Sequence, residues 1–178
     1  QKEFGRPKAL AHGVLNTFLK EGGGAIAISP SNIQDGAVNF NKCTYISWEK
    51  YEESPEIKIQ DGDIILVKTG STFGKTAIVK GLPERATLNP QLVVLKKIKI
   101  NNFYLGYMMG YRVVQDQISA FIVGGALPTL SQRLVAKFIL PIPSTKAEQE
   151  AIAQALSDAD ALIESLDQLI AKKRQIKQ

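Results

Sequence analysis

The stretch that sets the organisation of the chain is residues 140–178, which read LPIPSTKAEQEAIAQALSDADALIESLDQLIAKKRQIKQ. From Thr145 onward it contains neither glycine nor proline, the two residues that most often interrupt a helix. Thr145 and Glu148 have the spacing of a capping box, whose side chains accept hydrogen bonds from backbone N–H groups at a helix start. We therefore predict one helix of about 34 residues, about 50 Å long at 1.5 Å per residue.

Apolar residues along this predicted helix repeat at alternating spacings of four and three, which is the heptad pattern of a coiled-coil seam. The seam consists of Ile152, Leu156, Ala159, Ile163, Leu166 and Ile170. An apolar stripe of this length must be covered, either by a second helix, from this chain or another, or by the chain's own globular part. The sequence favours a partner helix and leaves the second arrangement open.

Outward from this helix, Pro141-Ile142-Pro143 separates it from a part that mixes strand and helix patterns. We predict a globular domain over 1–143 and a helical unit over 144–178, in the α+β class: a compact mixed α/β domain followed by a long coiled-coil helix. Extended segments are predicted at 25–29, 38–41, 43–46, 57–60, 64–67, 76–79, 92–95 and 138–140. Helices are predicted at 9–20, at 48–51, and from Asn102 to a close at Gly124-Gly125.

Composition excludes several classes of function. His12 and Cys43 are the only histidine and cysteine, so we expect no catalytic histidine relay, no disulfide framework and no metal site. No run reaches the roughly 18 apolar residues of a membrane helix, and the first residues lack the apolar core of a secretory signal. A cytoplasmic protein without a membrane partner is therefore expected.

The charge is concentrated in the globular part. Residues 1–144 hold seventeen basic and eleven acidic residues, a balance of +6, whereas residues 145–178 hold five and six, a balance of −1. A positive globular domain suits a polyanionic partner such as nucleic acid.

The segment Gly70–Thr76 is similar to a phosphate-binding P-loop but departs from it in two respects. Three residues separate its glycines, where a P-loop needs four, and the residues after it alternate like a strand instead of opening a helix. A nucleotide-binding enzyme is therefore the alternative hypothesis, and a polar loop between two strands is favoured. Such a loop suits contact with DNA phosphate through hydroxyl and ammonium donors, and the candidates are Lys68, Thr69, Ser71, Thr72 and Lys75.

A second polar segment, residues 85–91, carries side chains that can read base edges. Arg85, Asn89 and Gln91 have the donor and acceptor geometry for guanine or adenine in the major groove, although a plain connector between strands is equally compatible with the pattern. Lys42 and Arg133 are weaker candidates for phosphate contact. We predict no catalytic and no metal-ligating residue.

Four stretches in this order resemble the target-recognition half of a type I restriction–modification specificity subunit. They are Asn32–Gly36, Ile59–Ser71, the segment from Asn89 to Gly125, and Leu140–Pro143 followed by Glu148–Ala153. The last is the most specific. The opening residues, with the predicted helix at 9–20, match the family's usual start poorly.

The resemblance implies a DNA target-recognition domain in 1–143 and a spacer and dimerisation helix in 144–178. It implies double-stranded DNA, a methyltransferase subunit and a restriction subunit as partners, with S-adenosylmethionine and ATP held by those subunits only. The chain itself would then be non-catalytic. Because it carries one domain and one helix, a homodimer or a second recognition half would complete it. A non-DNA oligomerisation or adaptor module remains the third interpretation.

Overall fold

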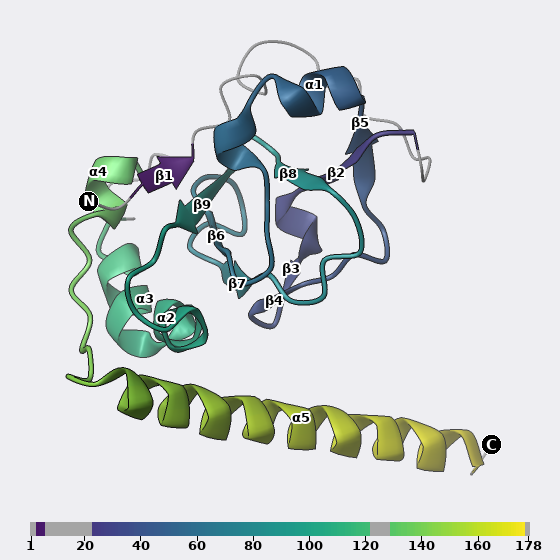
Figure 1. Cartoon of the computed structure of the whole chain (residues 1–178). Helices are drawn as coiled ribbons and strands as arrows, with labels where there is room; N and C mark the ends of the chain where they lie inside the picture. Colours follow the sequence, from purple (N-terminus) through teal and green to yellow (C-terminus); the bar gives the residue numbers. More distant parts are fainter. Residues whose placement is uncertain (1–2, 6–22, 122–128, 177–178) are drawn as a thin grey trace. The chain divides into compact units, whose positions relative to one another are not determined.

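The computed structural model describes residues 3–5, 23–121 and 129–176. The predicted helix at 9–20 and the predicted helix end at Gly124-Gly125 lie outside these ranges. The backbone divides between Pro141 and Ile142 into two compact units, which are described separately (Figure 1). Among the described helices, none has the length and apolar character needed to cross a membrane.

Two sheets form the centre of the first unit. The larger has six strands in the order β1 (Glu3–Gly5), β9 (Leu92–Lys96), β6 (Ile64–Val67), β7 (Thr76–Ile78), β4 (Ala37–Val38) and β3 (Ile33–Gln34). Its pairs are antiparallel except β4 with β7. The smaller has the order β5 (Thr44–Ile46), β2 (Ala25–Ile28) and β8 (Ala86–Leu88), with β2 and β8 parallel.

The apolar run of β6 is explained by burial on both faces of the larger sheet. Ile65 and Val67 pack with residues of the three-stranded sheet in one core cluster. Ile64 and Leu66 pack in a second cluster with residues of α2 (Asn102–Gly110), α3 (Arg112–Ser119) and α4 (Gln132–Val135). Because successive strand residues point to opposite faces, both faces must be apolar, and the predicted central strand is confirmed.

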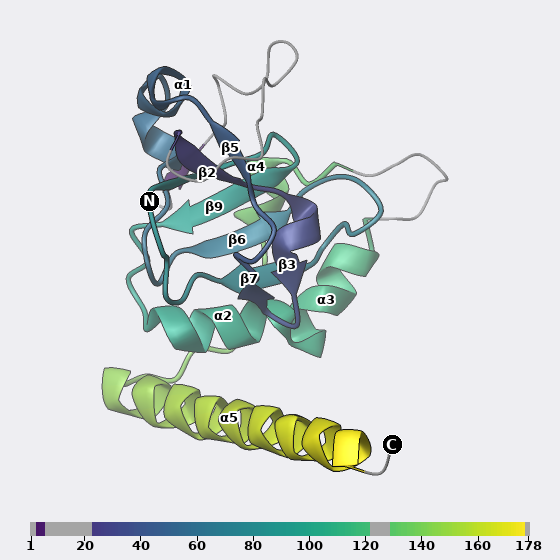
Figure 2. The ribbon, with the colours of Figure 1, turned by 90° about the vertical axis from the view of Figure 1, so that its right-hand side faces the viewer.

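The layers follow from these two cores. The six-stranded sheet lies between the three-stranded sheet and the helices α2 to α4, and Figure 2 shows β9, β6 and β7 side by side near α2 and α3. The outer face of the three-stranded sheet packs on α1 (Trp48–Glu52) and on a 3-10 turn at Pro55–Ile57. A second 3-10 turn occupies Pro30–Asn32. The α+β class predicted from the sequence is confirmed.

The predicted helix from Asn102 is wrong in its continuity, because it is broken at Tyr111. This residue is extended, with φ −80° and ψ 155°, so that α2 ends at Gly110 and α3 begins at Arg112. The break leaves helix carbonyls without an intrahelical partner, and the Gln115 amide donates to the Met109 carbonyl at 2.8 Å.

Two predicted strands are not formed, and of the predicted strand 38–41 only Val38 lies in a strand, β4. In 57–60 the alternating burial is present, but Pro55 starts a 3-10 turn and Ile59 makes one backbone bond, to the Ala86 carbonyl at 2.9 Å. In 138–140 a side chain, and not a neighbouring strand, pairs with the backbone. The Gln117 amide donates to the Ile139 carbonyl at 2.8 Å and accepts from its N–H at 2.9 Å, replacing a strand partner.

The second unit is the helix α5 (Lys146–Ile176), 31 residues long. The predicted start is confirmed, since the Thr145 hydroxyl accepts from the Glu148 N–H at 3.2 Å. Glu148 lies in the first turn and Lys173 and Arg174 in the last, each of the sign that favours the helix dipole.

Candidate nucleic-acid interface

The candidate interface begins where three strands of the larger sheet have their ends. β6 finishes at Val67, β7 begins at Thr76 and β9 begins at Leu92. The register pairs Val67 with Leu92 and Leu66 with Thr76. Because β6 runs antiparallel to both neighbours, the loop after β6 and the connector before β9 lie at the same end of these strands.

Backbone hydrogen bonds join these loops to a third segment. The Lys68 N–H donates to the Gln91 carbonyl at 2.9 Å, and the Leu130 N–H donates to the Lys68 carbonyl at 2.9 Å. These two bonds place residues 68–75, 89–91 and 129–133 next to one another, and we call the three segments together the strand-end surface. Sequence reasoning missed segment 129–131, because nothing in its composition indicates that it pairs with a loop about sixty residues earlier.

The glycines of the 68–75 loop are required by the hairpin itself. Gly70 and Gly74 have φ of +102° and +84°, in the region that side chains rarely adopt. The loop is closed by bonds from the Gly74 N–H to the Val67 carbonyl and from the Lys75 N–H to the Thr72 carbonyl. The strand β7 comes directly after the loop, so the strand–loop–helix arrangement of a P-loop is not formed here and the glycines need no phosphate to explain them.

The strand-end surface brings together seven of the eight residues predicted to bind DNA. Ser71, Lys75 and Gln91 are exposed. The other four are half-buried: Lys68, Thr69, Thr72 and Asn89.

Two further features shape this surface. The Asn89 side chain accepts from the Gln91 N–H at 2.9 Å, which shapes the turn around Pro90. Arg133, a weaker candidate, is exposed in α4 and joins the surface through its own segment.

The eighth residue, Arg85, lies elsewhere. It precedes β8 whereas Asn89 follows it, and the four residue steps of extended chain between them span about 13 Å. Its guanidinium lies 5.6 Å from the ring centroid of Trp48, which is 40% exposed, and Trp48 in turn packs edge-on against Tyr51. Lys42 lies at the Asn89 end of the three-stranded sheet, because it precedes β5, which runs antiparallel to β2.

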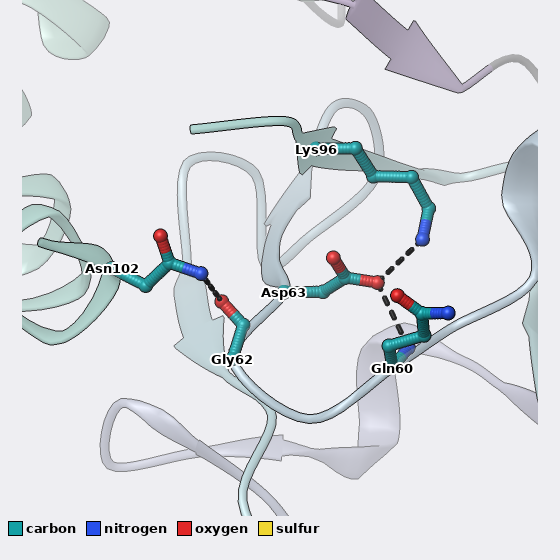
Figure 3. Close-up of polar contacts among 5 residues, drawn as sticks. All are labelled: Gln60, Gly62, Asp63, Lys96 and Asn102. Carbon is teal, nitrogen blue, oxygen red and sulfur yellow. Dashed lines mark hydrogen bonds and ion pairs between the residues drawn. The ribbon is translucent and has the colours of Figure 1, made fainter. Parts of the chain in front are cut away.

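The opposite end of the larger sheet is held by polar contacts (Figure 3). Asp63, before β6, accepts from the Lys96 ammonium at 2.6 Å and from the Gln60 N–H at 2.9 Å. The Asn102 amide donates to the Gly62 carbonyl at 2.9 Å. These contacts tie the start of β6 to the end of β9 and to the first turn of α2, so both ends of the strands are fixed by neighbours distant in sequence.

On α5 the predicted seam is accessible over most of its length. Ile163, Leu166 and Ile170 are 58%, 48% and 47% exposed. Leu156 and Ala159 are also exposed, and Ile152 is half-buried. Large apolar side chains spaced along one face and open to water favour association with another apolar surface.

Comparison with known proteins gives a consistent family. Residues 15–175 match the family described as type I restriction modification DNA specificity domain. Three solved structures share the fold. One is a chain from a structure of complex assembly and conformational transition of the type I R-M system, with TM-score 0.64 and 13% identity, covering 97% of this chain and 41% of that one.

The second is the HsdS subunit from Thermoanaerobacter tengcongensis, with TM-score 0.59, 13% identity and coverage of 94% and 39%. The third is the type I restriction-modification S subunit from M. genitalium, with TM-score 0.52, 17% identity and coverage of 98% and 43%. The chain therefore spans about two fifths of the length of these structures. A comparison with curated protein sequences gave no match.

Proposed function

Because the chain belongs to the family of type I restriction modification DNA specificity domains, we propose that it reads one half of a bipartite target in double-stranded DNA. The observation that carries the proposal is the convergence of three polar segments in the strand-end surface, through the Gln91–Lys68–Leu130 backbone pairing. The positive balance of residues 1–144 supports the same partner.

The strand-end surface offers two kinds of contact. Lys68, Lys75 and Arg133 supply positive charge for phosphate, which positions a protein on a duplex without reading its sequence. Asn89 and Gln91 carry amides of the kind that pair with adenine edges in the major groove. Arg85 lies at the other end of β8, with its guanidinium over the Trp48 ring, and this position suits phosphate or partner contact better than base readout beside Asn89.

We further propose that α5 pairs along its seam with a second copy of the chain or with a second recognition half. A 31-residue helix is about 46 Å long, so the pair would fix the distance between the two half-sites. The same helices would dock the methyltransferase subunit and, through it, the restriction subunit. S-adenosylmethionine and ATP would be bound by those subunits, and this chain would carry no catalytic step.

DNA binding is tested by the salt dependence of affinity for a duplex of mixed sequence. Each phosphate contact adds roughly one to the slope of log affinity against log salt. We expect Lys75→Ala to lower this slope by about one, while Lys99→Ala leaves it unchanged. Lys99 is a matched control, because it is also exposed and comes after β9, at the opposite end of the sheet. A flat salt dependence of the unaltered protein would refute the proposal.

The target itself is found by mapping methylated adenines in DNA from cells that carry the complete system. A split motif is expected, one half of which changes when the chain is exchanged. An unsplit motif, or a motif independent of this chain, would contradict target recognition.

Pairing of α5 is tested by sedimentation of the whole chain. Ile163→Lys with Leu166→Lys adds two charges to the seam and should convert a dimer to a monomer. Ser165→Lys with Gln168→Lys adds the same charges to the opposite face of the same turns and should leave the dimer intact. A monomer before any substitution would rule out self-association through the seam.

A further inference from the structure

Gln115 makes a contact that the proposed function does not use. This half-buried side chain of α3 directs both hydrogens of its amide nitrogen at carbonyl oxygens: that of Gly74 at 3.1 Å and that of Met109 at 2.8 Å. Gly74 belongs to the base of the 68–75 loop, and Met109 to the last turn of α2. One amide therefore joins the loop to the break between α2 and α3.

The loop lies tightly against α3 at this point. A Cβ placed on Gly74 would lie 2.8 Å from Cγ2 of Ile118, which is 2% exposed. Phe73, the preceding residue, is partly buried and packs against the core cluster that includes Val114 and Ile118 of α3. The inner side of the loop is thus held by α3, while Ser71 and Lys75 stay exposed on the outer side.

On the other side of the loop the contact is with Gln91. A Cβ on Gly70 would lie 3.1 Å from the Gln91 side-chain nitrogen, so Gly70 gives this side chain room to lie against the loop. The loop therefore lies between two glutamine side chains. Gln115 binds its base at Gly74, and Gln91 lies against Gly70 on the other side.

We propose that Gln115 is a positioning residue for target recognition. It fixes the 68–75 loop against α3, so that the exposed side chains of the loop contact the DNA from one defined position. This inference rests on the proposed function, in which that loop contacts the duplex. It assigns the role to the amide nitrogen, because only a group with two donor hydrogens can satisfy both carbonyl oxygens at once.

Three substitutions separate this role from a general effect on α3. Gln115→Glu keeps the shape but presents an ionised carboxylate to two carbonyl oxygens. Gln115→Met keeps the length without any donor. Gln117→Glu is the matched control, because Gln117 also lies on α3 and donates to two carbonyl oxygens, those of Val113 at 2.7 Å and Ile139 at 2.8 Å, away from the loop.

The first measurement is amide hydrogen exchange and needs no DNA. The amides of Phe73, Gly74 and Lys75 close the loop. In both Gln115 variants these amides should exchange about tenfold faster, since the loss of the hydrogen-bond donor to the Gly74 carbonyl shifts the equilibrium between the closed and open loop by about this factor. In the Gln115 variants the β9 amides should exchange at an unchanged rate. In Gln117→Glu the loop amides should also exchange at an unchanged rate. In Gln115→Glu, lowering the pH should restore only part of the protection, because a protonated carboxyl has one donor hydrogen and can satisfy one of the two carbonyl oxygens.

The second measurement is discrimination between a duplex carrying the mapped motif and a scrambled duplex, with the methyltransferase partner present. In the Gln115 variants the ratio of the affinities for the two duplexes should fall about tenfold, while the slope of log affinity against log salt stays unchanged. Unchanged exchange at the loop, or exchange raised equally in β9, overturns the inference whatever the DNA result. Faster loop exchange with full discrimination also overturns it. If the unaltered protein discriminates between no duplexes, the proposed function fails, and the exchange result then shows only a structural contact.

Discussion

Replacing Gly74 by alanine tests the packing of the 68–75 loop on α3. The backbone at Gly74 has φ +84°, where an alanine costs about 1–2 kcal/mol. The new Cβ would also lie 2.8 Å from Ile118 Cγ2, and an overlap of this kind in a packed core costs about 1–3 kcal/mol. The free energy of unfolding should therefore fall by about 2–5 kcal/mol, measured by urea denaturation with an unchanged m-value.

Gly36 provides the control for the backbone contribution. Its φ is +76°, and a Cβ there would meet nothing within 4 Å, so Gly36→Ala should cost only about 1–2 kcal/mol. Trimming Ile118 to alanine should remove most of the extra cost of Gly74→Ala, so that the double variant is less destabilised than the sum of the two single variants. Equal losses for the two glycines, or strict additivity with Ile118→Ala, would refute the reasoning.

Three further predictions concern other parts of the first unit. Asp63→Asn should lower the free energy of unfolding by about 1–3 kcal/mol, because it weakens the bond to the Lys96 ammonium; adding Lys96→Met should cost less than a second full loss, and additive denaturation midpoints would contradict this. Burial, and to a lesser extent the Glu84 carboxylate, raises the pKa of the Cys43 thiol above its usual value. The folded state then keeps a proton that the unfolded chain loses, so stability should fall as pH rises above about 9, and Cys43→Ala should lessen that fall between denaturation curves at about pH 8 and about pH 10. Ser131→Ala removes the acceptor for the Leu134 N–H and should cost about 1 kcal/mol in thermal unfolding, an unchanged midpoint being the contrary result.

Local patterns predicted the elements whose environment is set by neighbouring residues. The run Ile64–Val67 required apolar surroundings on both faces, and the Thr145 cap marked the start of α5 within the chain itself. The prediction of a loop between two strands at Gly70 and Gly74 is confirmed, because the segment 76–79 after them is rich in β-branched residues and contains β7.

The errors arose where a distant side chain replaced a local partner. A segment that alternates like a strand at 138–140 is satisfied by Gln117, and α2 stops at Gly110 with Gln115 donating to a carbonyl that the break sets free. Arg85 was grouped with Asn89 because the two are close in sequence, yet a strand of three residues sends them to opposite ends. No periodicity in the chain encodes these long-range pairings.

The side-chain contacts of Figure 3 and the exposed side chains of the strand-end surface lie at opposite ends of the strands of one sheet. Asp63, Lys96 and Asn102 hold one end, and Ser71 and Lys75 are exposed at the other. Substitutions at those exposed positions are therefore nearly neutral for folding, since changes away from packed or paired groups stay within about 0.5 kcal/mol. A lineage of such chains can therefore change Ser71 and Lys75 one residue at a time, so that ligand preference can vary at these positions while Gly70 and Gly74 keep the loop folded.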